Sequence, residues 1–84
     1  MDYLTIIWDL DDDPQGNVQH IAEHDLTKEE VEEVLAEPEG RSTSRSSGLP
    51  LVFGATSTGR FIAVVFQEID ADTVKPVTAY DLEE

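Results

Sequence analysis

The 84-residue sequence contains no cysteine, so no disulfide can stabilise its fold. It has no apolar run near the roughly 18 residues that a membrane-spanning helix requires. A basic and then apolar leader, the pattern of a secretory signal, is also missing from its start. These absences predict a cytoplasmic protein with no membrane segment.

The chain is also short, which bounds the core it can build. A protein of this size buries only about 60% of its unfolded surface, so one sheet covered by one layer of helices is the largest core we expect. We therefore predict a single domain over residues 1–84.

Basic residues are scarce: five stand against 19 acidic residues, for a formal net charge of −14. All acidic residues lie outside residues 41–67, and this acid-free segment contains Arg41, Arg45 and Arg60. If the protein binds an anion, these three arginines are the candidate binding residues. The alternative is that strands and Ser/Gly turns are simply poor in carboxylates. A cytosol of very high salt would also favour such an acidic composition, and the net charge would then say little about partners.

The first part of the chain predicts a strand and a short helix. Tyr3 to Trp8 (YLTIIW) is rich in β-branched and aromatic residues, as strands are. Asp13 and Pro14 are suited to the N-cap and first position of a helix over about residues 14–24. The helical spacing of its apolar residues predicts one buried face, made of Val18, Ile21 and Ala22.

A second helix has the clearest local signals in the sequence. Thr27 and Glu30 have the spacing of a capping box, and Leu26 and Val31 that of a hydrophobic staple. Pro38 should end the helix. Its buried stripe is expected to comprise Val31, Val34 and Leu35.

The remaining residues predict three or four antiparallel strands. Residues 41–50 (RSTSRSSGLP) are either a polar edge strand or a binding loop, and Leu51–Thr56 and Phe61–Gln67 form a hairpin around a turn at residues 57–59. Phe61–Gln67 is apolar on both faces and should be central, with the face opposite the helices closed by a partner or a second copy. The last strand, Val74–Tyr80, contains Pro76, which favours an edge or a bulge, and residues 81–84 read as a frayed acidic tail. The fold class is α+β, with both helices on one face of the sheet.

Two motifs have the spacing of metal sites. Asp9, Asp11 and Asp13 match the first ligands of a calcium loop, but Pro14 and His20 stand where that loop needs glycine and a bidentate acid, so we favour helix capping and predict no metal site. Residues 20–24 (HIAEH) match the inverted zinc-protease pattern. The alternatives are opportunistic zinc binding by His20 and His24, or a polar helix stripe that includes Asp13 and Asn17.

The order of landmarks resembles the BrnT-type toxins of the RelE-like ribonuclease group and a related family of short bacterial proteins. The similarity spans roughly residues 7–80. It is carried by Trp8-Asp9, Asn17, His24-Asp25-Leu26-Thr27 (where the family tends to show K-H-G-V-S/T), Glu29-Glu30-Val31, Arg41, Gly59-Arg60 before FIAVVF, and Val77-Thr78-Ala79-Tyr80 (where the family often reads I-S-A-R).

This resemblance implies a toxin that cleaves RNA without a metal or cofactor and is held inactive by an antitoxin protein. Cleavage of this kind needs a group that takes the 2′-OH proton and cations that stabilise the phosphorane. Carried over by position, His24 is the acid–base candidate, and Arg41 and Arg60 are the phosphate-binding candidates.

The sequence departs from the toxin pattern at two cationic positions. Asp9 and its neighbours lie where the toxins carry a lysine, and Tyr80 stands where they show an arginine. Two functions therefore remain: a protein-binding module on the toxin scaffold, with weak or no nuclease activity, or a metal-independent endoribonuclease. The expected partner is an antitoxin-like protein or a second copy bound through the sheet, with RNA as the substrate of the alternative.

Overall fold

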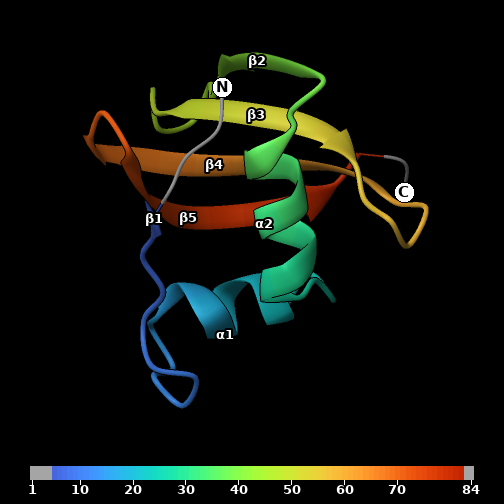
Figure 1. Cartoon of the computed structure of the whole chain (residues 1–84). Helices are drawn as coiled ribbons and strands as arrows, with labels where there is room; N and C mark the ends of the chain where they lie inside the picture. The colour runs from blue at the N-terminus through green and yellow to red at the C-terminus, as the bar shows by residue number, and fades with distance from the viewer. Residues whose placement is uncertain (1–4, 83–84) are drawn as a thin grey trace.

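A five-stranded mixed sheet forms the centre of the protein, in a computed structural model that describes residues 5–82 (Figure 1). Its spatial order is β1-β5-β4-β3-β2, in which β1 is parallel to β5 and the other neighbours are antiparallel. The strands are β1 (Thr5–Ile6), β2 (Gly40–Thr43), β3 (Pro50–Ala55), β4 (Phe61–Asp70) and β5 (Thr73–Asp81). The predicted α+β class is confirmed, and the parallel β1 makes the sheet mixed.

The first strand is shorter than predicted. β1 comprises two residues, and Tyr3 and Leu4 of the predicted strand lie outside the described residues. Ile7 still donates its N–H to the carbonyl of Val74 at 2.9 Å, so the chain follows β5 slightly beyond the strand.

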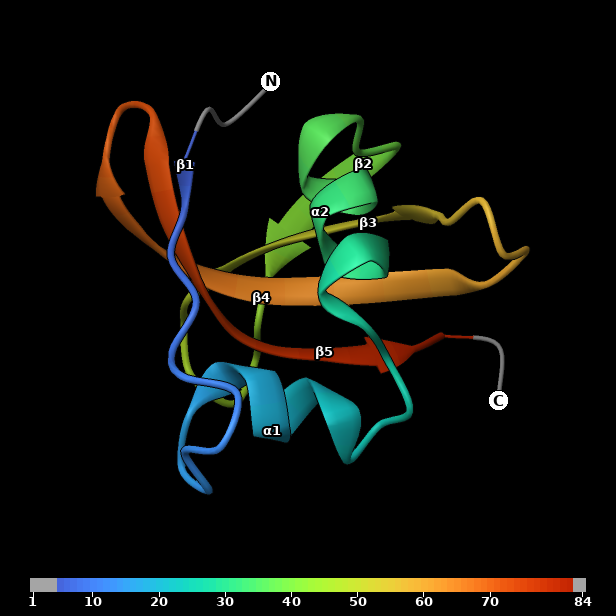
Figure 2. The same ribbon diagram turned by 60° about the horizontal axis from the view of Figure 1, so that its bottom comes forward.

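Both helices lie on one face of the sheet, as predicted (Figures 1 and 2). The second, α2 (Lys28–Ala36), begins with the expected capping box: the Thr27 side chain accepts from the N–H of Glu30, and the Glu30 carboxylate accepts from the N–H of Thr27. Val31, Val34 and Leu35 are buried in the core against β3 and β4, which confirms the predicted stripe. Each such side chain contributes roughly 1.5–3 kcal/mol to stability.

The first helix differs from its prediction. α1 (Asn17–Ala22) has Gly16 as its N-cap, so Asp13 is not the cap residue. Asp13 instead accepts from the N–H of Gln15 in the preceding turn. The buried residues of α1 are Asn17 and Ile21, whereas Ala22 is exposed. The prediction is confirmed for Ile21 and wrong for Ala22, while Val18 is half-buried, because the helix is short and the polar Asn17 occupies one of its buried positions.

The central strand β4 is apolar on both faces, as expected. Ile62, Val64 and Phe66 face the helices, while Ala63 and Val65 face the other side of the sheet, where they form a smaller cluster with Leu51 and half-buried neighbours. Both helices lie on the opposite face (Figure 2), so no helix within residues 5–82 packs on this smaller cluster.

The last strand bulges at its proline. The pairing shifts between Val65↔Thr78 and Phe66↔Pro76, which leaves Val77 as the extra residue. β5 is an interior strand, so the edge alternative is wrong and the bulge alternative is confirmed. Pro76 is tolerated because β1 pairs only with Thr73 and Val74 and needs no N–H from position 76.

The predicted tail over residues 81–84 overlaps the end of β5. Asp81 is the last residue of β5, and the N–H of Leu82 donates to the carbonyl of Phe61 at 2.8 Å. Glu83 and Glu84 lie outside the described residues. Neither described helix is long and apolar enough to cross a membrane.

Candidate functional site

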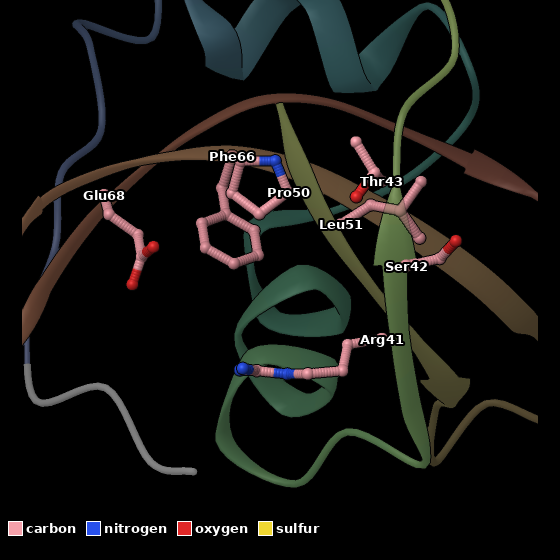
Figure 3. A pocket seen from close by; sticks show the side chains of 7 residues that line it. All are labelled: Arg41, Ser42, Thr43, Pro50, Leu51, Phe66 and Glu68. Atoms are coloured by element: carbon pink, nitrogen blue, oxygen red, sulfur yellow. The ribbon is translucent and has the colours of Figure 1, made fainter. Parts of the chain in front are cut away.

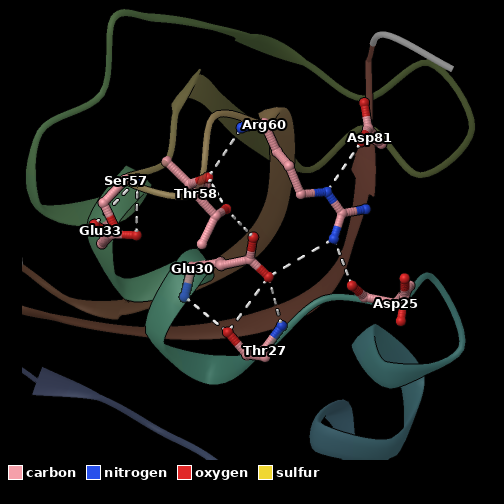
Figure 4. A network of polar contacts seen from close by, with 9 residues as sticks. Asp25, Thr27, Glu30, Glu33, Ser57, Thr58, Arg60 and Asp81 are labelled. Atoms are coloured by element: carbon pink, nitrogen blue, oxygen red, sulfur yellow. Dashed lines mark hydrogen bonds and ion pairs between the residues drawn. The ribbon is translucent and has the colours of Figure 1, made fainter.

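Arg60, a predicted phosphate-binding residue, is held by the protein itself (Figure 4). Its Nε donates to Asp81 Oδ2 at 3.1 Å, and its Nη1 donates to the backbone carbonyl of Asp25 at 2.5 Å. The same Nη1 lies 3.8 Å from Glu30 Oε1. The guanidinium therefore joins the segment before α2, the start of α2 and the end of β5.

Glu30 is the buried carboxylate of this network, with only 6% of its surface exposed. Besides Arg60, it accepts from the N–H of Thr27 at 3.2 Å and from the hydroxyl of Thr58 at 2.7 Å. A buried carboxylate is tolerated when it is paired and hydrogen-bonded. Arg60 therefore has a structural role that would be lost if it turned toward a phosphate.

His24, the candidate acid–base residue, is exposed in the turn that follows α1. Its ring lies 6.2 Å from that of His20, centroid to centroid, at an interplanar angle of 29°. His24 precedes Asp25, which has a left-handed backbone (φ 64°) and supplies the carbonyl that binds Arg60. His24 and Arg60 thus belong to contacting segments, but the two side chains share no hydrogen bond in the described part of the chain.

Three of the aspartates after β1 each contact a different residue. Asp9 pairs with Lys75 at 3.5 Å, Asp11 pairs with Lys28 at 3.2 Å, and Asp13 accepts from Gln15. Among residues 5–82, no three side chains of His, Asp or Glu are grouped so that they could hold a metal ion. These carboxylates act in ion pairs and turns.

Asp9 and Asn17 are joined by two hydrogen bonds that have no counterpart in the predicted polar stripe. Asn17 was expected on a polar stripe, yet it is only 4% exposed. Its N–H donates to the carboxylate of Asp9, and this hydrogen bond, assisted by Lys75, lowers the pKa of Asp9 against the opposing effect of desolvation.

Arg41 and Arg45 differ from the other cations of the chain. Lys28, Lys75 and Arg60 each pair with a carboxylate. Neither Arg41 nor Arg45 has a carboxylate within ion-pair distance anywhere in residues 5–82, and both are exposed on or just after β2, the edge strand. Of the predicted anion-binding arginines, these two remain available to a ligand.

A pocket of about 300 Å³ opens beside Arg41 (Figure 3). It is lined by side chains of three neighbouring strands: Arg41, Ser42, Thr43, Pro50, Leu51, Phe66 and Glu68. Glu68 and Phe66 could not be associated with Arg41 from the sequence, because only the β2-β3-β4 pairing brings them together. The structure therefore groups Arg41 with β4 residues rather than with His24 and Arg60.

Comparison of the chain with family models, curated proteins and solved structures gave no match.

Proposed function

We propose that this chain is a protein-binding module on a RelE/BrnT-like toxin scaffold, with little or no ribonuclease activity. The observation that carries the proposal is the occupied guanidinium of Arg60, which binds Asp81 and the Asp25 carbonyl and lies beside Glu30. The order of strand, two helices on one face and four antiparallel strands is also what the resemblance to these toxins implies.

Cleavage of RNA through a 2′,3′-cyclic phosphate needs cations aimed at the phosphorane. To serve in this way, Arg60 would have to leave its carboxylate partners. The buried Glu30 would then have no cation beside it. Arg41 lies on β2 in a pocket with Phe66 and Glu68, and His24 does not line that pocket. No hydrogen bond or ion pair within residues 5–82 joins the side chains of these three candidate catalytic residues.

The test is incubation of the purified protein with a mixed-sequence RNA at low and at molar salt. Arg60→Ala is a poor control because its loss would also damage the fold. The double variant His24→Gln/Arg41→Gln is better, since both side chains are exposed. We expect no cleavage above the level of this variant, and cleavage by the wild type that the variant loses would contradict the proposal.

One observation favours the second candidate, a metal-independent endoribonuclease. The exposed His24 lies next to Asp25, whose carbonyl binds Arg60, so an imidazole and a guanidinium come from contacting segments. In the same assay, such an enzyme would produce RNA fragments with 2′,3′-cyclic phosphate ends. The His24→Gln variant would not produce these fragments.

A further inference from the structure

Within residues 5–82, no strand pairs with the outer side of β2. β2 pairs on one side with β3 and is the last strand of the sheet. The N–H of Ser44 donates to the carbonyl of Leu49, so in the alternating antiparallel pattern the backbone groups of Ser42 face β3 and those of Arg41 and Thr43 face outward. Such outward groups are a template for another strand.

The charge at this edge is opposite to that of the rest of the chain. Arg41 and Arg45 stand in the acid-free residues 41–67, and both lack ion-pair partners among the described residues. The remaining three cations are all engaged with carboxylates of the chain. The β2 edge is therefore where the carboxylates of a ligand would meet guanidinium groups that have no ion-pair partner within residues 5–82.

We propose that the β2 edge binds an extended acidic segment of a partner protein as an additional strand. This inference rests on the proposed function and specifies the chemical character of the partner protein. Backbone groups of Arg41 and Thr43 would supply the ladder, while Arg41 and Arg45 select carboxylates.

Other occupants fit this edge less well. Two-fold pairing with the β2 of a second copy would bring together four arginines that lack an ion-pair partner in the described part of each chain, along strands of four residues each. RNA has no peptide backbone to pair with the outward N–H and C=O groups of β2. An acidic strand would provide hydrogen-bond partners for the outward backbone groups of β2 and carboxylates for Arg41 and Arg45.

The experiment uses a labelled eight-residue peptide of alternating valine and glutamate, with a lysine-for-glutamate peptide as the control. Its binding is measured by fluorescence anisotropy for the wild type, for Arg41→Gln/Arg45→Gln and for Thr43→Pro. Proline at position 43 removes one outward N–H and leaves the bonds to β3 intact. The matched control, Lys28→Gln/Lys75→Gln, loses the same charge away from the edge.

We expect the acidic peptide to bind the wild type and the lysine variant alike. It should bind the double arginine variant and Thr43→Pro about tenfold more weakly. Hydrogen exchange at the amides of Arg41 and Thr43 should slow when the peptide binds, which attraction between charges alone would not cause.

Several results would overturn the proposal. They are absence of binding, equal weakening in the arginine and lysine double variants, equal binding of the lysine peptide, or unchanged exchange at Arg41 and Thr43. The arginines would then only keep the edge from pairing. A wild-type dimer that Thr43→Pro dissociates would also overturn it, in favour of self-association. RNA cleavage with intact peptide binding would refute the proposed function and leave the edge site standing.

Discussion

Asp9 and Asn17 bind each other in both directions: the N–H of Asp9 donates to Asn17 Oδ1 at 2.9 Å, and the N–H of Asn17 donates to Asp9 Oδ2 at 2.9 Å. The Asn17 amide also donates to the carbonyls of Ile7 and Pro76. One buried side chain thus joins the first turn of α1, the segment after β1 and the bulge of β5.

Replacing Asn17 with alanine should lower the free energy of unfolding by about 2–4 kcal/mol. The change leaves the carbonyl of Pro76 and the N–H of Asp9 without the partner that they have now, and each unsatisfied buried group costs about 1–3 kcal/mol. Urea unfolding measures the effect. The exposed neighbour Gln15→Ala is the control and should change stability by less than about 0.5 kcal/mol. An Asn17→Ala variant as stable as this control would contradict the structural role.

Acid should weaken the fold through Asp9 and Asp70. The pKa of Asp9 is lowered by the N–H of Asn17, and that of Asp70 by the N–H of Asp72. Carboxylates with a depressed pKa in the folded state contribute stability above their unfolded pKa, about 3.9, and lose it as the pH falls through the folded value.

The stability difference between wild type and Asp9→Asn measures the share of Asp9. We expect this difference to be constant between pH 5 and 7 and to shrink below about pH 4. A difference that stays constant down to pH 2 would show that the charge of Asp9 contributes nothing.

The Arg60 network predicts non-additive mutations. Arg60→Gln should destabilise the protein by about 1–3 kcal/mol, because it leaves the buried Glu30 without its cation. Arg45→Gln, at an exposed position with no ion-pair partner among the described residues, should stay within about 0.5 kcal/mol of the wild type. In the double variant Arg60→Gln/Glu30→Gln, the loss should be smaller than the sum of the two single losses. Strict additivity in chemical unfolding would mean that the two residues do not interact.

The capping box at the start of α2 predicts a smaller effect. Thr27→Ala removes the oxygen that accepts from the N–H of Glu30 and should cost about 1 kcal/mol. Thr27→Ser keeps that oxygen and should cost less. Thermal unfolding of the two variants separates the cap from the lost methyl group, and equal losses would assign the effect to packing.

The sequence predicted the elements whose signals are local. The Thr27 and Glu30 capping box, the buried stripe of α2 and the β3–β4 hairpin all depend on residues close in the chain, and each forms as expected. The parallel pairing of β1 with β5 was not predicted, because Thr5 meets Thr73 only in the folded sheet.

The candidate site was harder to predict for the same reason. Arg60 looked like a free cation because its partners Asp81 and Asp25 are 21 and 35 residues away. Asn17 was predicted on a polar helix stripe because its side chain is polar. The carbonyl of Pro76 that it binds is 59 residues away, so no local pattern indicated its burial. Arg41 and Arg45 were predicted as anion-binding residues by the lack of nearby acids, and the structure leaves them unpaired within residues 5–82.

The central claim is that Arg60 belongs to the fold and that the chain does not use it to bind RNA. The chain has three arginines, so the Nε–H region of a ¹H–¹⁵N spectrum should hold three side-chain signals that can be assigned by mutation. We predict that the Arg60 signal exchanges slowly with water and does not move when a short mixed-sequence RNA is added. Movement of the Arg60 signal together with the imidazole signals of His24 on RNA addition would contradict the account and favour the ribonuclease.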